Sequence, residues 1–265
     1  MNDFADKQVR VEMDSSVALI TLARPEKHNA FDHAMALDLH YAVRHVANGA
    51  RGGAVRAIVL AAEGKVFSVG GDLAYFAETE DRSEPMRLVA TALHDTVELL
   101  TAVPVPVVSA VHGVAAGAGV GLALAADIIV AGPDAKLRLA YTAGGLSPDC
   151  GATWILPRSV GMARAMDLAL TNRAVDAVEA EKWGLISRLT DSDDVVGEAL
   201  SIAKQLAAGP TEAFTATKHL MRTSQDRSFV THLNSEAEAI SRLVESPDGR
   251  EGIDAFLTKR APTFS

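Results

Sequence analysis

One stretch constrains the fold of this chain more than any other: residues 105–127 pass from a strand-like segment through a glycine-rich turn into an Ala/Leu-rich segment. The run 105–111 is apolar and rich in valine, which is typical of a strand buried on both faces. Four glycines and one alanine then follow at the turn: Gly113, Gly117, Ala118, Gly119 and Gly121. Small residues let a backbone approach a ligand closely, and the start of a helix leaves N–H groups unpaired. The stretch therefore predicts a place that binds a negative group, or a group that becomes negative.

Bulk properties narrow the class of protein. With 265 residues, the chain is long enough for one large domain or two small ones. Its formal charge of −9 argues against a nucleic-acid partner and against docking on an anionic membrane. Cys150 is the only cysteine, which excludes a disulfide framework, and the histidines lack metal-ligand spacing. The N-terminus has no apolar leader and no apolar run reaches membrane-spanning length, so we expect a cytoplasmic protein without a membrane or metal partner.

The remaining pattern is mixed α/β, followed by helices alone. Residues 9–13 and 17–22 predict a hairpin, and Asp32 is a plausible N-cap of a helix that ends near Gly49. Further strands are expected at 55–62, 128–131 and 137–139, and further helices from residue 83, near 153, and at 163–170 and 178–183. From residue 193 onward only helical segments follow, at 193–207, 211–223, 229–245 and 249–257.

Several motifs in this order resemble the crotonase (enoyl-CoA hydratase/isomerase) superfamily. The likeness covers about residues 9–260 and rests on these segments: 22–25 with 29–30, 67–73, 112–119, 126–127, 181–186 and 250–260. It implies an α/β fold, a crotonase (ClpP-like) spiral of ββα units with a C-terminal helical region. Residues 1–192 would form the spiral core with the acyl-CoA site. Residues 193–265 would form a helical extension that serves oligomerisation and covers the coenzyme A site.

The resemblance also implies a reaction type. Members of the family bind acyl-CoA thioesters and hold an enolate with two backbone N–H groups, which here would be those of Gly71 and Ala118. Preorganised amide donors stabilise the negative charge that develops on the thioester oxygen, and each contributes about 3 kcal/mol. Coenzyme A would enter as part of the substrate, with no permanently bound cofactor, and the protein would be a homo-oligomer, either a trimer or a dimer of trimers.

By the same resemblance, substrate and coenzyme A contacts fall on five segments of the chain, and the last of them would come from this subunit or from a neighbouring one. The residues are Lys27, His28, Ala30, Val69, Gly70, Gly71, Asp72, Leu73, Gly117, Ala118, Tyr141, Pro148, Phe256 and Lys259. Lys27 and Lys259 would offset the acidic charge of the protein near an anionic ligand. Asp72, Asp127, Trp154 and Trp183 are also expected in structural roles, as caps and packing residues.

Two carboxylates that hydratases of this family use are missing here, which narrows the reactions that the protein could catalyse. Hydratases of the family use two glutamates to activate water, and these positions hold Gly121 and Tyr141 here. Asp149 remains, in a segment that resembles ring 1,2-epoxyphenylacetyl-CoA isomerases and Δ3,Δ2-enoyl-CoA isomerases. One carboxylate is sufficient when it removes a proton at one carbon and returns it at another. The favoured hypothesis is therefore an isomerase in which Asp149 carries the proton and Tyr141 and His94 line the acyl pocket.

A second resemblance leaves the mechanism open. In 4-chlorobenzoyl-CoA dehalogenase, an aspartate at the place of Asp149 attacks the ring and a histidine at the place of His94 activates water. A hydratase and a non-catalytic acyl-CoA-binding protein also remain as alternatives. A pocket-facing Asp149 would favour an enzyme, and an exposed one a silent binding protein.

Two other enzyme classes fail on their motifs. The glycines at 117, 119 and 121 imitate a dinucleotide fingerprint, but its third glycine would fall on Leu122 or Leu124. The Gly-x-Ser-x-Gly motif of serine hydrolases is absent from the sequence.

Overall fold

The computed structural model describes residues 7–78 and 80–265. Within them a six-stranded sheet has the order β1-β2-β3-β4-β6-β9, and a three-stranded sheet has the order β5-β7-β8. Strands β1 and β2 form the predicted antiparallel hairpin, and the other neighbours in the large sheet are parallel. The bounds of its strands are β1 Val9–Asp14, β2 Val17–Leu22, β3 Ala57–Ala62, β4 Val107–Val111, β6 Ile128–Ala131 and β9 Arg188–Leu189.

The small sheet arises because two strands of the large sheet are each followed by a second strand. β4 leads into β5 (Val114–Ala116) and then α4 (Ala118–Leu124), while β6 leads into β7 (Lys136–Arg138). β5 and β7 pair in parallel, and β8 (Val175–Asp176) closes the sheet. This repetition of strand, strand and helix is the predicted spiral of ββα units. It brings the glycine-rich turn to the start of α4.

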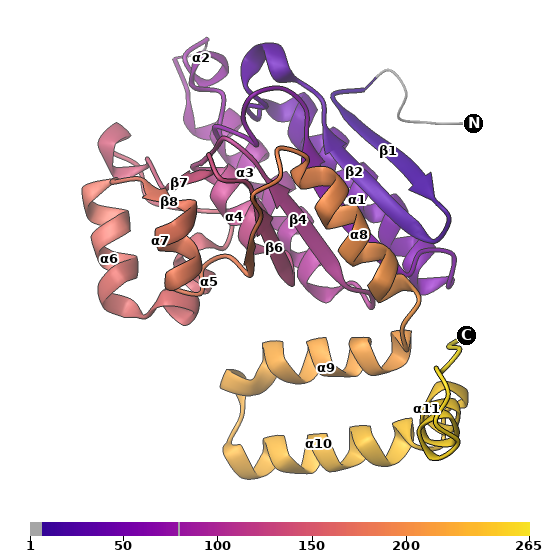
Figure 1. Cartoon of the computed structure of the whole chain (residues 1–265). Helices are drawn as coiled ribbons and strands as arrows, with labels where there is room; N and C mark the ends of the chain where they lie inside the picture. Colours follow the sequence, from indigo (N-terminus) through magenta and orange to yellow (C-terminus); the bar gives the residue numbers. More distant parts are fainter. Residues whose placement is uncertain (1–6, 79) are drawn as a thin grey trace.

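Helices cover both faces of the large sheet. On one side lie α1 (His33–Arg51) and α3 (Ser83–Ala102), packed on each other over the larger hydrophobic core. On the other side α8 (Val195–Ala207) packs on β2, β3, β4 and β6 around a second core (Figure 1). Three more helices flank the small sheet: α5 Ala152–Val160, α6 Met162–Thr171 and α7 Ala177–Lys182. The short helix α2, Leu73–Phe76, precedes α3.

Two local details qualify the sequence predictions for α1. Asp32 caps the helix as expected, because its side chain accepts the Met35 N–H. The predicted end at Gly49 is wrong, since the helix continues to Arg51 and Gly52 is the C-cap. A Cβ at residue 49 would lie 3.0 Å from a methyl group of Val55, so this glycine serves close packing rather than termination.

The C-terminal helices follow the predicted segments closely. They are α9 Thr211–Thr223, α10 Phe229–Leu243 and α11 Pro247–Leu257. α9 and α10 run below the sheet in Figure 1, and α11 lies beside the end of α10 near the C-terminus. The predicted division of the chain after residue 192 stays a prediction; α8, which follows that point, belongs by its contacts to the sheet.

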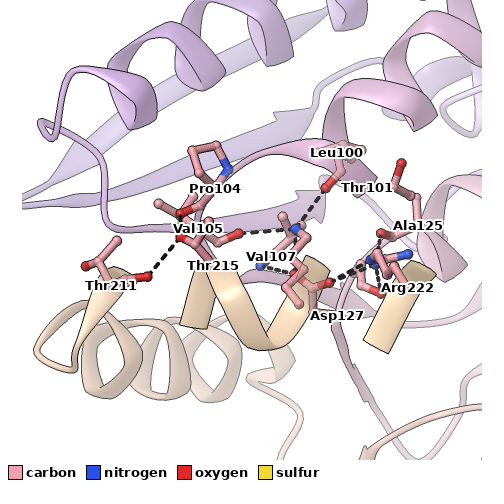
Figure 2. Close-up of polar contacts among 12 residues, drawn as sticks. Leu100, Thr101, Pro104, Val105, Val107, Ala125, Asp127, Thr211, Thr215 and Arg222 are labelled. Atoms are coloured by element: carbon pink, nitrogen blue, oxygen red, sulfur yellow. Dashed lines mark hydrogen bonds and ion pairs between the residues drawn. The ribbon is translucent and has the colours of Figure 1, made fainter. Parts of the chain in front are cut away.

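α9 is attached to the core by buried charge, and Figure 2 shows this attachment. Asp127 accepts from Lys218 at 2.8 Å and from Arg222 at 2.7 Å. The two cations also donate to backbone carbonyls at the C-terminal ends of α3 and α4, those of Leu100 and Ala125. Asp127 therefore has the structural role expected from the sequence.

The two tryptophans also have packing roles. The guanidinium of Arg158 lies 3.3 Å from the centre of the Trp154 ring. Those of Arg164 and Arg173 lie 4.7 Å and 5.0 Å from the centre of the Trp183 ring. No helix in the described part of the chain is both long and apolar enough to cross a bilayer.

Candidate active site

The site begins where the loop after η1 (Pro25–Lys27) meets the loop after β3. Both His28 and Asn29 have left-handed backbone, with φ of 53°. Asn29 is fully buried, and its carbonyl accepts the Ser68 hydroxyl at 2.8 Å. Phe31 N–H donates to Gly70 O at 2.7 Å, and Asp72 N–H donates to Phe31 O at 2.9 Å. These hydrogen bonds involve the Gly70 carbonyl and the Asp72 N–H, on either side of Gly71, but not the Gly71 N–H.

A second amide, also without an acceptor among the described residues, belongs to the glycine-rich turn. Gly117 has φ 53° and ψ −129°, a conformation open to glycine, and Ala118 begins α4. A Cβ at Gly70 would lie 2.9 Å from Ala116 O and 3.0 Å from Ala118 N, so the two loops touch. Among residues 7–78 and 80–265, neither Gly71 nor Ala118 donates its N–H to the protein. Two free amide donors therefore stand side by side on facing loops.

Asp149 lies in the loop between η2 (Thr142–Gly144) and α5, and its side chain is 28% exposed. Tyr141 donates its hydroxyl to Asp149 Oδ1 at 2.5 Å. His94 Nε2, from α3, lies 4.0 Å from Asp149 Oδ2 and accepts the Cys150 N–H at 3.2 Å. The structure thus brings together the three side chains that the sequence singled out for chemistry: Asp149, Tyr141 and His94.

Two neighbours of Asp149, Tyr141 and Cys150, have raised pKa values. Burial, followed by the nearby Asp149 charge and its hydrogen bond, raises the pKa of Tyr141 well above its usual value of 10. The same causes raise the pKa of the Cys150 thiol. Tyr141 is therefore a phenol that donates, and Cys150 a thiol, across the neutral pH range.

The space around Gly121 shows why this position holds no glutamate. A Cβ on Gly121 would lie 2.3 Å from Cys150 O and 2.6 Å from Cys150 Cβ. The turn after Asp149 thus occupies the space into which any side chain at position 121 would project. Because Gly121 is three residues after Ala118, this contact also places the Asp149 turn one helical turn from the Ala118 amide.

The predicted coenzyme A residues are brought together in part. Val69 N–H donates to His28 O at 3.2 Å, so the Lys27–Ala30 segment borders the Val69–Leu73 loop. Lys27, His28 and Leu73 are exposed beside the amide pair, Ala30 and Asp72 are buried, and Pro148 is half-buried next to Asp149. Phe256 and Lys259 are exposed, at α11 and directly after it, and Figure 1 places α11 far from α2 and the Gly71 loop. Within one chain they do not reach the site.

Asp72 also caps α2, accepting the Ala74 and Tyr75 N–H groups, which agrees with its expected structural role.

One residue that organises the site, Arg24, was not predicted from the sequence. Arg24 bonds Asp32 at 2.9 Å, Asp72 at 3.2 Å and the Ala30 carbonyl at 2.8 Å, and so fastens the two loops together. The only signal for Arg24 in the sequence was its place in the 22–25 motif.

A cavity of about 700 Å³ lies between α3, α5 and α9. Val97, one helical turn after His94, and Gly151, two residues after Asp149, line it at one end. Lys218 and Arg222 line it on α9. The cavity therefore extends from beside the Asp149 turn toward the C-terminal helices.

Comparison with known proteins agrees with this fold. The sequence profile of the enoyl-CoA hydratase/isomerase family matches residues 12–265. A probable enoyl-CoA hydratase of Rhodobacter capsulatus is 41% identical, with 97% of each chain covered. The 1,2-epoxyphenylacetyl-CoA isomerase of Escherichia coli is 36% identical over 96% of each chain. 4-Chlorobenzoyl coenzyme A dehalogenase-1 of an Arthrobacter species is 31% identical, covering 98% of this chain and 94% of the relative.

A solved structure extends the agreement to three dimensions. A putative enoyl-CoA hydratase/isomerase from Mycobacterium abscessus matches with a TM-score of 0.92 and 39% identity, covering 97% of this chain and 99% of that one. The protein is thus a crotonase-fold enzyme of acyl-CoA metabolism. The chain belongs to the enoyl-CoA hydratase/isomerase family.

Proposed function

We propose that this protein is an acyl-CoA isomerase in which Asp149 carries a proton between two carbons of an enoyl thioester. The observation that carries the proposal is one half-buried carboxylate on a turn that packs directly on α4, the helix that begins at the free Ala118 amide, with no room for a side chain at position 121. A reaction that begins and ends with a proton on carbon needs one such base.

The steps balance without another reactant. Asp149 takes a proton from the carbon between the thioester carbonyl and the double bond of a 3-enoyl thioester, and the electron pair is delocalised onto the thioester oxygen as a dienolate. The Gly71 and Ala118 N–H groups hold that oxygen. The resulting carboxylic acid then returns the proton to a different carbon, so the double bond moves and the mass is unchanged.

Tyr141 supports this role by binding one carboxylate oxygen. Its hydroxyl donates to Oδ1, which leaves Oδ2 to accept the substrate proton. Because its pKa is raised, Tyr141 remains a donor at neutral and moderately alkaline pH.

The geometry around His94 favours an isomerase over a dehalogenase-type hydrolase. A neutral histidine whose Nε2 accepts the Cys150 N–H carries its proton on Nδ1. Neither ring nitrogen then has a free lone pair with which to activate water. A dehalogenase-like reaction would require that hydrogen bond to be broken.

The cavity between α3, α5 and α9 is the proposed place for the acyl chain beyond the reacting carbons. Gly151, which has a left-handed backbone with φ of 73°, lines it without a side chain. Replacing Val97 by Phe should lower kcat/KM for a decenoyl thioester much more than for a butenoyl one. Equal losses for both chains would contradict this placement.

We also propose a homo-oligomer, a trimer or a dimer of trimers, in which α11 of a neighbouring copy completes the coenzyme A site. Phe256, Phe229 and Ile240 on α11 and α10 are 82%, 75% and 69% exposed, and covering them would be favourable. Light scattering after gel filtration tests this assembly: a monomer at micromolar concentration would contradict it.

The main test offers purified protein a panel of 2-enoyl, 3-enoyl, ring-epoxide and 4-chlorobenzoyl CoA thioesters, alongside D149N. We expect a product of unchanged mass with a shifted double bond or expanded ring, lost in D149N. Gain of water would indicate hydration, and loss of chloride would restore His94 as a base. Binding without any turnover would instead indicate a silent acyl-CoA-binding protein. Full activity of D149A would reject the proton-carrier role.

A further inference from the structure

The residue after Asp149 is held in an unusual backbone conformation. Cys150 has a φ of 50°, in the left-handed region that few non-glycine residues adopt, and its side chain is 1% exposed. Such a conformation persists only where surrounding contacts determine it. Two contacts on opposite sides of the turn do so here.

The first contact is with α4. The 2.3 Å and 2.6 Å separations between a Cβ at Gly121 and Cys150 are far below ordinary van der Waals distance. Part of this contact is with a backbone oxygen, which cannot rotate away as a side-chain tip can. Glycine at 121 is therefore what allows the turn to lie directly on the helix whose first N–H belongs to Ala118.

The second contact is with α3. The Cys150 N–H donates to His94 Nε2 at 3.2 Å, while the same nitrogen is 4.0 Å from Asp149 Oδ2. Since α3 and α4 pack on each other, the Cys150 turn is held between the two helices. Asp149 is joined to Cys150 by one peptide bond, so the position of that turn sets the position of the carboxylate.

We propose that Gly121 and His94 are positioning residues that clamp the Cys150 turn and thereby aim the Asp149 carboxylate. The inference rests on the proposed isomerase function for its kinetic consequence, while the clamp itself can be measured without any turnover. It makes position 121 a determinant of which reaction this fold performs, because a side chain there and the present Asp149 turn exclude each other.

The first variant is G121A. Alanine has a higher helix propensity than glycine, so an uncrowded position would tolerate or prefer it. Here the added methyl group must push the Cys150 turn away by a distance on the order of 1 Å, and a misplacement of that size can lower kcat by about 100-fold. Binding of a saturated, unreactive butyryl-CoA should change little, because the Gly71 and Ala118 amides remain. G52A is the matched control, since a Cβ there meets nothing closer than 3.6 Å.

The second pair of variants is H94Q and H94A. A glutamine carbonyl can accept the Cys150 N–H but cannot act as a general base. The positioning role predicts that H94A loses kcat with KM nearly unchanged, and that H94Q recovers most of it. If H94Q is as impaired as H94A, His94 acts as a base and the positioning role is rejected.

Hydrogen exchange supplies the readout that does not depend on catalysis. The amide of Cys150 should exchange faster in G121A and H94A than in the wild type and H94Q. If the wild type turns over no thioester but these differences appear, the clamp stands and the proposed function has failed. If G121A keeps both full turnover and slow exchange, the clamp is overturned. Should G121A not fold, H94A, which adds no atoms, decides the question by the same two measurements.

Discussion

The hydroxyl of Tyr141 lies 2.5 Å from Oδ1 of Asp149, and this is the hydrogen bond that orients the candidate catalytic carboxylate. Tyr141 occupies the position at which hydratases, by resemblance, hold their second glutamate. A neutral donor thus stands where a second carboxylate would otherwise be. The other glutamate position holds Gly121, so the carboxylate that Tyr141 binds comes from a third position, Asp149.

Replacing Tyr141 by Phe removes that donor without changing the ring. A hydrogen bond to a charged group contributes about 1.5–3 kcal/mol, so we expect kcat on a 3-enoyl thioester to fall by roughly 10- to 100-fold. Y41F, at a half-exposed tyrosine on α1, is the control and should keep full activity. Unchanged kcat in Y141F would show that the carboxylate is oriented by other contacts.

Alkaline titration should separate Tyr141 from the other two tyrosines. Its pKa is raised by burial and by Asp149, so it remains protonated in the folded protein after an ordinary tyrosine has ionised. Because the folded-state pKa exceeds the unfolded value of about 10, its contribution to stability is complete below pH 10 and declines as the pH rises beyond it. Phenolate absorbance should show one tyrosine that ionises only with unfolding, and Y141F should remove that step. Three tyrosines titrating together in the native protein would contradict this.

Much of the architecture could be predicted from local pattern. The strand before the glycine-rich turn, the N-terminal hairpin and the C-terminal helices follow hydrophobic periodicity, which depends on neighbours along the chain. Strand β5 could not be predicted, because three residues between Gly113 and Gly117 carry no periodic signal. Its pairing with β7 is what defines it as a strand.

For the site, the sequence identified which residues matter but not how they touch. Asp149, Tyr141 and His94 were named as candidates, and their meeting depends on a loop folding back onto α3. The contact of Gly121 with Cys150 joins residues nearly thirty positions apart and leaves no mark on either local pattern. Gly121 was notable only as a missing glutamate, whereas the structure shows what fills its space.

The single cysteine gives a clean probe of the Asp149 turn. Burial raises the pKa of Cys150, and thiols react with alkylating reagents as thiolates, so the native protein should label very slowly. In urea the same thiol should label completely. Faster native labelling of G121A than of wild type would report the displaced turn, while rapid stoichiometric labelling of the native wild type would contradict its burial.

The attachment of α9 through Asp127 should contribute measurably to stability. The side chains of Lys218 and Asp127 are 10% and 20% exposed, so D127N leaves a largely buried cation without its carboxylate. Removing one partner of a buried pair costs about 3 kcal/mol or more, which should be visible as a lower urea midpoint. E84Q removes an exposed ion pair with Arg87 and should change stability by less than about 1 kcal/mol.

The pH dependence of this attachment has a defined sign. Burial lowers the pKa of Lys218 despite the nearby Asp127, so above the folded-state pKa the unfolded chain binds more protons than the folded protein. Stability from this group therefore rises with pH between the lowered pKa and the unfolded value of about 10.4. K218M should remove that rise, measured as the difference in unfolding free energy between wild type and variant across alkaline pH. A difference that does not change with pH would mean that Lys218 titrates as an exposed lysine, and that the charge at the α9 attachment is solvated.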